Sequence, residues 1–193
     1  MKEYVVLNVN GDGYKFSLGE RGGQIPYSET LVQTLRDRIG LTGNLVPTLR
    51  ERIGLTDSEP TLSCGEGFCG RCAVLADGKV IASCMTLTSE CSGKKIVTFE
   101  GLRNKKNGEP DPLVNAILGY PGFQCRFCTP GIIVASKSIF NKNPHPTESE
   151  IQEGLSGNFC RLEKECGIRT QLVSHLAKYS ASRRGYYERF STL

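Results

Sequence analysis

The spacing of the cysteines constrains this chain more than any other feature of its sequence. The chain has 193 residues and nine cysteines, and eight of the nine fall into two sets of four. The first set is Cys64, Cys69, Cys72 and Cys84, the second set is Cys125, Cys128, Cys160 and Cys166, and Cys91 stands alone between them. Four thiolates are the ligand number of an iron-sulfur cluster and of a tetrahedral zinc ion. We therefore expect one metal centre in each half of the chain.

The N-terminus and the charge balance limit where this protein works and what it binds. Residues 1–7 run directly into a strand-like alternation, with no apolar stretch long enough for a signal peptide or a membrane span. We expect a cytoplasmic protein without a membrane partner, whose cysteines hold metal instead of forming disulfides. The net charge is only +4, and no stretch concentrates Lys and Arg as a nucleic-acid-binding face does. We therefore expect no nucleic-acid partner.

Strand signals dominate the first half of the chain. Strands are expected at residues 4–10, 14–18, 73–76, 79–83 and 96–99. Residues 10–13 join the first two strands and Asp77-Gly78 joins the next two, and both connections are rich in residues that tolerate the positive φ of tight turns. The sequence therefore predicts two β-hairpins and a further strand.

A short helix and a repeat lie between the hairpins. Thr30 and Gln33 form a capping-box pattern, and the apolar spacing that follows continues until Gly40, where a helix can end. Residues 31–42 are almost repeated at residues 45–56. Two copies are too few for a solenoid, so we interpret the 31–56 segment as a local tandem duplication that leaves one copy as an inserted surface helix.

The second half of the chain reads as helical. Residues 104–112 are polar, charged and contain proline, as linkers do, so we divide the chain into residues 1–103 and residues 104–193. Helices are expected at residues 113–120, 129–140 and 147–155, followed by a fourth with an apolar stripe at Ile168, Leu172, Val173 and Leu176. The C-terminal tail at residues 182–190 mixes cations with aromatics, and we expect it to dock on a partner subunit.

The first cysteine set favours iron-sulfur chemistry over zinc. Three of its thiols lie in the nine-residue loop 64–72, with the C-x4-C-x2-C spacing that opens the cluster site of plant-type ferredoxins. The loop also holds glycines, which let the backbone wrap closely around a cluster and direct N–H groups at its sulfurs. Zinc ribbons usually present two short knuckles instead. We expect a [2Fe–2S] cluster here.

The second cysteine set is ambiguous when it is taken alone. Cys125 and Cys128 precede an expected helix N-terminus, whose partial positive charge favours an anionic thiolate cluster. Cys160 and Cys166 follow about thirty residues later, between the third and fourth expected helices. Four thiolates at helix ends suit either an iron-sulfur cluster or zinc.

Together the two sets resemble the small iron-sulfur subunit of the xanthine dehydrogenase family of molybdenum hydroxylases. The resemblance rests on the C-x4-C-G-x-C loop, on residues 124–131 (QCRFCTPG) and on residues 157–161 (GNFCR), and it extends over residues 3–178. It implies an α+β fold in which an N-terminal β-grasp, plant-ferredoxin-like domain is followed by an all-α helical-bundle [2Fe–2S] domain. It also implies that the first set holds the outer cluster and the second set holds the inner one.

The resemblance further implies the partners of this chain. A large catalytic subunit would carry molybdopterin, with Gln124 and Cys166 turned toward that cofactor, and a medium subunit would bind FAD. Electrons would pass from molybdopterin through both clusters toward the FAD or another acceptor. The sequence contains no P-loop and no G-x-G-x-x-G between a strand and a helix, so we expect the catalytic residues on another subunit and none in this chain.

Two departures from the family pattern affect the second cysteine set. The family reads glycine where this chain has Arg126, and a cation that points toward the cluster would raise its potential. The family also ends in C-R-C, whereas here Leu162-Glu-Lys-Glu165 separates the last two cysteines. We interpret these four residues as an insertion, with Cys166 still the fourth ligand.

Two other functions compete with the electron-transfer subunit. One is an independent ferredoxin-like carrier without a fixed partner, and the other is a zinc-stabilised interaction module with no redox role. Iron content separates the zinc module from the other two, and co-purification with molybdenum-containing subunits separates the subunit from the free carrier.

Overall fold

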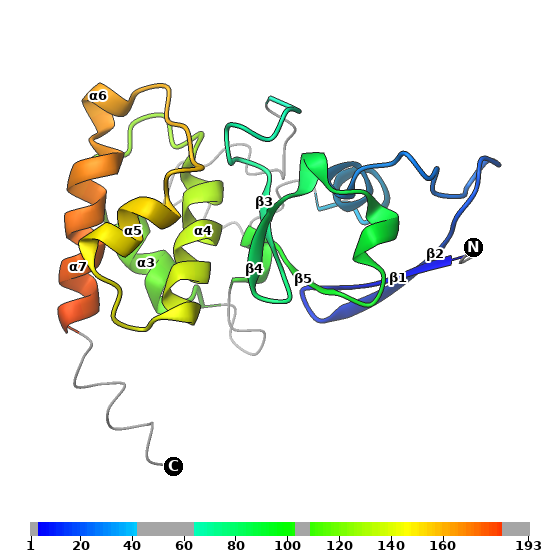
Figure 1. Ribbon diagram of the computed structural model, residues 1–193, viewed down its shortest axis with the longest axis horizontal. Coiled ribbons are helices and arrows are strands. Elements are labelled where there is room, and N and C mark those ends of the chain that lie inside the picture. Colours follow the sequence, from blue (N-terminus) through cyan, green and yellow to red (C-terminus); the bar gives the residue numbers. More distant parts are fainter. Residues whose placement is uncertain (1–3, 42–63, 103–108, 183–193) are drawn as a thin grey trace, which may run out of the picture.

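The computed structural model describes residues 4–41, 64–102 and 109–182, apart from the side chains of residues 165, 166 and 169. Figure 1 shows a half built around a sheet beside a half built from helices, which makes the fold α+β. The second copy of the repeat, at residues 45–56, and most of the C-terminal tail lie outside the described residues. Within the described ranges, no helix combines the length and the apolar character needed to cross a membrane.

The sheet has five strands in the order β2-β1-β5-β3-β4. The strands are β1 (Tyr4–Val9), β2 (Asp12–Ser17), β3 (Ala73–Ala76), β4 (Lys79–Ala82) and β5 (Lys95–Val97). β1 pairs antiparallel with β2 and parallel with β5, and β3 pairs antiparallel with both β4 and β5. Each of the five expected strands is confirmed, although β5 ends earlier than expected because Phe99 begins a short helical turn.

Both expected hairpins are confirmed, and their turns explain why these residues are present. Asn10 and Gly11 have φ values of 54° and 89°, and Asp77 and Gly78 have φ values of 49° and 82°. Two consecutive residues with positive φ make the turn whose twist matches that of the flanking strands. Each turn therefore uses one residue that tolerates this region and one glycine.

The helix expected after the first hairpin is present and packs on the sheet. It begins as α1 (Leu31–Gln33) and continues as a wider helical turn, η1 (Thr34–Arg38). The Gln33 side chain accepts a hydrogen bond of 2.9 Å from the N–H of Thr30, as a capping box requires. Leu31 and Leu35 are fully buried in the core of the sheet half.

The remaining helices and helical turns were predicted in part. The short turns are η2 (Ser83–Met85), η3 (Thr88–Cys91), η4 (Phe99–Gly101) and η5 (Ile168–Leu172), and the helices are α3 (Pro112–Leu118), α4 (Thr129–Lys142), α5 (Glu148–Gly154), α6 (Glu163–Cys166) and α7 (Val173–Ser182). The four helices expected in the second half correspond to α3, α4, α5 and the joined η5 and α7. The single turn α6 was not expected. It is formed by most of the segment that we interpreted as an insertion.

Strand β3 contributes to two hydrophobic cores, one on each of its faces. Val74 and Ala76 pack with the helix and strands of the sheet half, and Ala73 and Leu75 pack with the helices. All four residues are buried, as expected for a strand that is covered on both faces. β3 is therefore part of the hydrophobic core of both halves, and α4 lies directly against it.

We predict that Leu75→Ala destabilises the protein by about 2–5 kcal/mol, because it opens a cavity in the core between β3 and the helices. Leu75 is 3% exposed, whereas Val80, its partner across the β3–β4 ladder, is 42% exposed. Val80→Ala should cost less than about 1 kcal/mol. Urea unfolding followed by far-ultraviolet circular dichroism under anaerobic conditions measures both, and equal losses would contradict a core shared through β3.

Candidate metal centres

The loop that carries the first three cysteines directs backbone N–H groups at a sulfur. The N–H of Glu66 lies 3.4 Å from the Sγ of Cys64. Burial would raise the pKa of the Cys64 thiol, but hydrogen bonds from the loop outweigh burial and lower that pKa to about 7. The donors are the backbone N–H groups of Glu66, Phe68 and Cys69 and the Cys69 side chain. Cys64 is therefore readily deprotonated, which is the form that binds metal.

The four cysteines of the first set come together as two pairs. Cys64 and Cys69 are hydrogen-bonded to each other, and so are Cys72 and Cys84. Cys72 and Cys84 are buried at 3% and 6% exposure, and they pack with Val32 of α1. Burial, followed by the hydrogen bond with Cys72, raises the pKa of Cys84 to about 12. The Cys84 thiol is therefore neutral unless a metal is bound.

The second set is brought together at the start of α4. Cys128 is the residue before the first turn of that helix, as expected, and it is hydrogen-bonded to Cys160. Burial, with smaller contributions from Cys160 and Cys125, raises the pKa of Cys128 well above its usual range. Cys125 is exposed, whereas Cys128 and Cys160 are buried. Cys166 is the last residue of α6, and its side chain is outside the described part of the structure.

The pairwise arrangement of the first set suits a dinuclear cluster. A [2Fe–2S] cluster takes two cysteines on each of its two irons. The two pairs of the first set provide that donor pattern, so the residues fit the cluster that the sequence predicted.

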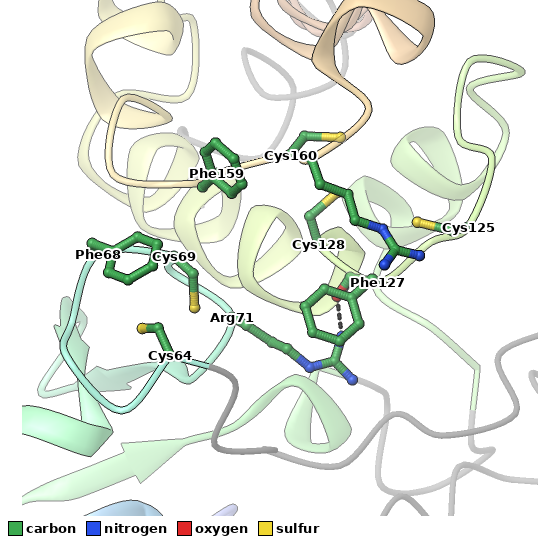
Figure 2. A pocket seen from close by; sticks show the side chains of 10 residues that line it. Cys64, Phe68, Cys69, Arg71, Cys125, Phe127, Cys128, Phe159 and Cys160 are labelled. Carbon is green, nitrogen blue, oxygen red and sulfur yellow. Dashed lines mark hydrogen bonds between the residues drawn. The ribbon is translucent and has the colours of Figure 1, made fainter.

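A cavity of about 310 Å³ lies between the two cysteine sets. Figure 2 shows Cys64 and Cys69 on one side of it and Cys125, Cys128 and Cys160 on the other. The remaining lining residues are Phe68, Phe127, Phe159, Arg71 and Arg161. The two candidate centres therefore face a common space that is bordered by aromatic rings and two guanidinium groups.

Close packing holds the two centres next to each other. The N–H of Phe159 donates to the carbonyl of Cys69 at 3.0 Å, which connects the two sets through the backbone. A Cβ added to Gly131, in the first turn of α4, would lie 2.2 Å from the carbonyl oxygen of Gly70. No side chain can be placed there, so the start of α4 rests directly on the first cysteine loop.

Arg71 connects the two ligand loops and was not predicted from the sequence. It lies between Cys69 and Cys72, is only 6% exposed, and donates through Nη1 to the carbonyl of Phe127. Its guanidinium also lies 3.9 Å from the centre of the Phe127 ring. The sequence carries no signal for this contact, because residues 71 and 127 are distant and neither is a ligand in its motif. Gln124, which was expected near a cofactor, is exposed and adjoins the exposed Cys125.

Arg126 occupies a backbone conformation that explains the glycine of the family pattern. Its φ is 55°, one of three positive values at non-glycine residues among those described. Residues with a Cβ are strained in this left-handed region. The Nη1 atom of Arg126 is buried and has no hydrogen-bond partner. Position 126 therefore favours glycine for steric reasons.

Comparison with known proteins relates this chain to iron-sulfur proteins. Residues 98–172 match a family described as a [2Fe-2S] binding domain. A protein of Bacillus subtilis (strain 168), named as a probable component of xanthine dehydrogenase, is 41% identical over 178 residues, which cover 89% of this chain and 88% of that protein. The nicotine 6-hydroxylase small subunit of Paenarthrobacter nicotinovorans is 40% identical over 133 residues, with 69% of each chain covered.

Solved structures show a similar fold. A chain of quinoline 2-oxidoreductase from Pseudomonas putida 86 matches with a TM-score of 0.66 at 28% identity, covering 90% of this chain and 94% of its own length. The aldehyde oxidoreductase from Desulfovibrio desulfuricans matches with a TM-score of 0.69 at 27% identity, and this chain corresponds to 17% of that longer chain. The likeness thus extends over both halves of the protein.

We predict that Cys91→Ala retains the full iron content of the protein. Cys91 is fully buried in the core of the sheet half with Val5 and Leu7, and burial raises the pKa of its thiol. We therefore expect it to act as a small apolar filler and not as a ligand. Iron analysis and visible absorption of the anaerobically purified variant measure this, and the loss of one cluster would show that the ligand sets are misassigned.

We predict that Arg126→Gly raises the free energy of unfolding by about 1 kcal/mol, because glycine relieves the left-handed strain at this position. Arg161→Gly is the matched control, since it removes an arginine near the same cavity from a position that is not among the described residues with positive φ. Urea midpoints compare the two variants. A loss of stability in Arg126→Gly equal to that in Arg161→Gly would contradict the strain argument.

Proposed function

Because this chain belongs to the iron-sulfur subunits of xanthine dehydrogenase and related molybdenum hydroxylases, we propose that it relays electrons from a molybdopterin site on a large catalytic subunit toward an FAD subunit or another acceptor. The chain is an electron-transfer component of a heteromeric oxidoreductase. The observation that carries the proposal is the cavity that cysteines of both sets line. When bound, [2Fe–2S] clusters supply one-electron oxidation and reduction.

The proposed ligands divide between the two halves of the fold. The outer cluster would be held by Cys64, Cys69, Cys72 and Cys84, and the inner cluster by Cys125, Cys128, Cys160 and Cys166. The hydrogen-bonded pairs of the first set support the first assignment, and the pairing of Cys128 with Cys160 supports the second. The first half would then be a β-grasp domain ending at residue 103, and the second a helical domain beginning at residue 104.

The place of its backbone supports the proposal that Cys166 is the fourth inner ligand. It ends α6, and Gly167 follows with a φ of 57°, so the chain turns sharply before η5. The single turn α6 contains three of the four additional residues 162–165. The apolar stripe that begins at Ile168 still packs in the helical core. This arrangement supports an insertion that leaves the last cysteine as the fourth inner ligand.

The exposed end of the second set is the proposed side for the catalytic partner. Gln124 and Cys125 are both exposed, whereas the other described cysteines of the inner site are buried. An incoming cofactor can therefore approach the inner cluster at this edge without displacing core residues. We place the molybdopterin of the large subunit here and the FAD of a medium subunit toward the outer cluster.

We predict that single cysteine variants remove one cluster at a time. Cys84→Ala should abolish the electron paramagnetic resonance signal of the outer cluster, and Cys166→Ala that of the inner cluster, each with the other signal intact, because the two ligand sets share no residue. Spectra of the reduced, anaerobically purified chain measure this outcome. Two unchanged signals in Cys166→Ala would refute its assignment as a ligand.

Co-purification tests the partner part of the proposal. A large subunit that contains molybdenum and a second subunit that contains FAD should co-purify with the tagged chain. A chain that carries both clusters but purifies alone from its native cell would instead support the independent carrier.

A further inference from the structure

A buried cation lies between the two ligand loops. Arg71 belongs to the first loop and is 6% exposed, yet its guanidinium reaches the second loop, where it donates to the carbonyl of Phe127 and stacks on the ring of the same residue. Figure 2 shows this side chain crossing the space between the two cysteine sets.

The surroundings of Arg71 explain how a guanidinium is tolerated at this depth. Removing a cation from water costs several kcal/mol unless other charges or dipoles replace the lost hydration. A carbonyl and an aromatic face supply part of this replacement. The cavity that Arg71 lines is also bordered by five cysteines, whose thiolates would be negative in the metal-bound protein. A positive group at this place is therefore matched to two anionic clusters at once.

We propose that Arg71 is a positioning residue shared by the two clusters, whose buried positive charge raises the reduction potentials of both. The inference rests on the proposed ligand sets. Reduction adds one negative charge to a cluster, so a fixed cation nearby stabilises the reduced form more than the oxidised form. The charge is held in place by its contacts with Phe127, which lies between Cys125 and Cys128 of the other ligand set.

Exposure distinguishes Arg71 from the second cation of the cavity. The guanidinium of Arg161 lies 6.0 Å from the same Phe127 ring, but Arg161 is exposed, so water and salt screen its charge. The effect on the potentials should therefore belong mainly to Arg71. It should also persist at high ionic strength, because buried charges are screened much less than exposed ones.

The test is a potentiometric titration of both clusters, followed by electron paramagnetic resonance, in the full-length protein. In Arg71→Gln, which removes the charge but keeps a hydrogen-bond donor, the ratio of reduced to oxidised cluster at a fixed potential should fall by about tenfold for both clusters. For a one-electron couple this is a shift of about 59 mV to lower potential. Arg71→Lys, which keeps the charge, should remain within about threefold of the unmodified protein.

Lys15→Gln is the matched control. Lys15 also lies over an aromatic ring, 4.3 Å from the centre of Tyr4, but on the edge strand β2, far from the helices α3 to α7. The Lys15→Gln substitution removes one positive charge and one cation–π contact. The reduction potentials of both clusters should stay unchanged. Arg161→Gln should give a smaller shift than Arg71→Gln, and the shift should disappear at high salt.

The outcomes separate this inference from the proposed function. Two clusters in the unmodified protein with unchanged potentials in Arg71→Gln would overturn the inference alone, and would leave Arg71 a purely structural residue. An unmodified protein that contains zinc instead of iron would overturn the proposed function. If Arg71→Gln fails to bind iron, Arg71→Lys decides: unmodified potentials in the lysine variant support the role of the charge, and failure of the lysine variant to bind iron refutes it.

Discussion

The close approach of α4 to the first cysteine loop is the constraint on which the rest of this structure depends. Gly131 lies against the carbonyl of Gly70, and a Cβ on Gly70 would in turn lie 2.6 Å from the carbonyl of Gly157. Three glycines from distant parts of the sequence thus allow three backbone segments to meet. Since each segment also carries cysteines of the proposed ligand sets, the same contact that joins the two halves brings the two candidate centres to one cavity.

Local signals in the sequence predicted the elements and most of the site. The two hairpin turns, the capping boxes at Thr30 and Thr147, and the helix that begins at Thr129 are all confirmed. These features depend on residues that are close in sequence, so they can be predicted without a structure. The cysteine spacing could be interpreted for the same reason, because three ligands of the first set occupy one short loop.

Features that depend on contacts between distant residues could not be predicted. The burial of β3 on both faces and the contact of Arg71 with Phe127 both arise when the halves pack together. The turn α6 was missed because its sequence has neither a capping residue nor an apolar stripe. The strain at Arg126 was noticed only as a departure from a family pattern, and the backbone conformation supplies its physical cause.

The central claim is that paired cysteines hold two dinuclear iron centres, and metal analysis of the anaerobically purified chain tests it most directly. We expect about four irons per chain, two for each [2Fe–2S] cluster, with no stoichiometric zinc. Two zinc ions per chain, or only two irons with the second cysteine set free to react with a thiol reagent, would contradict it.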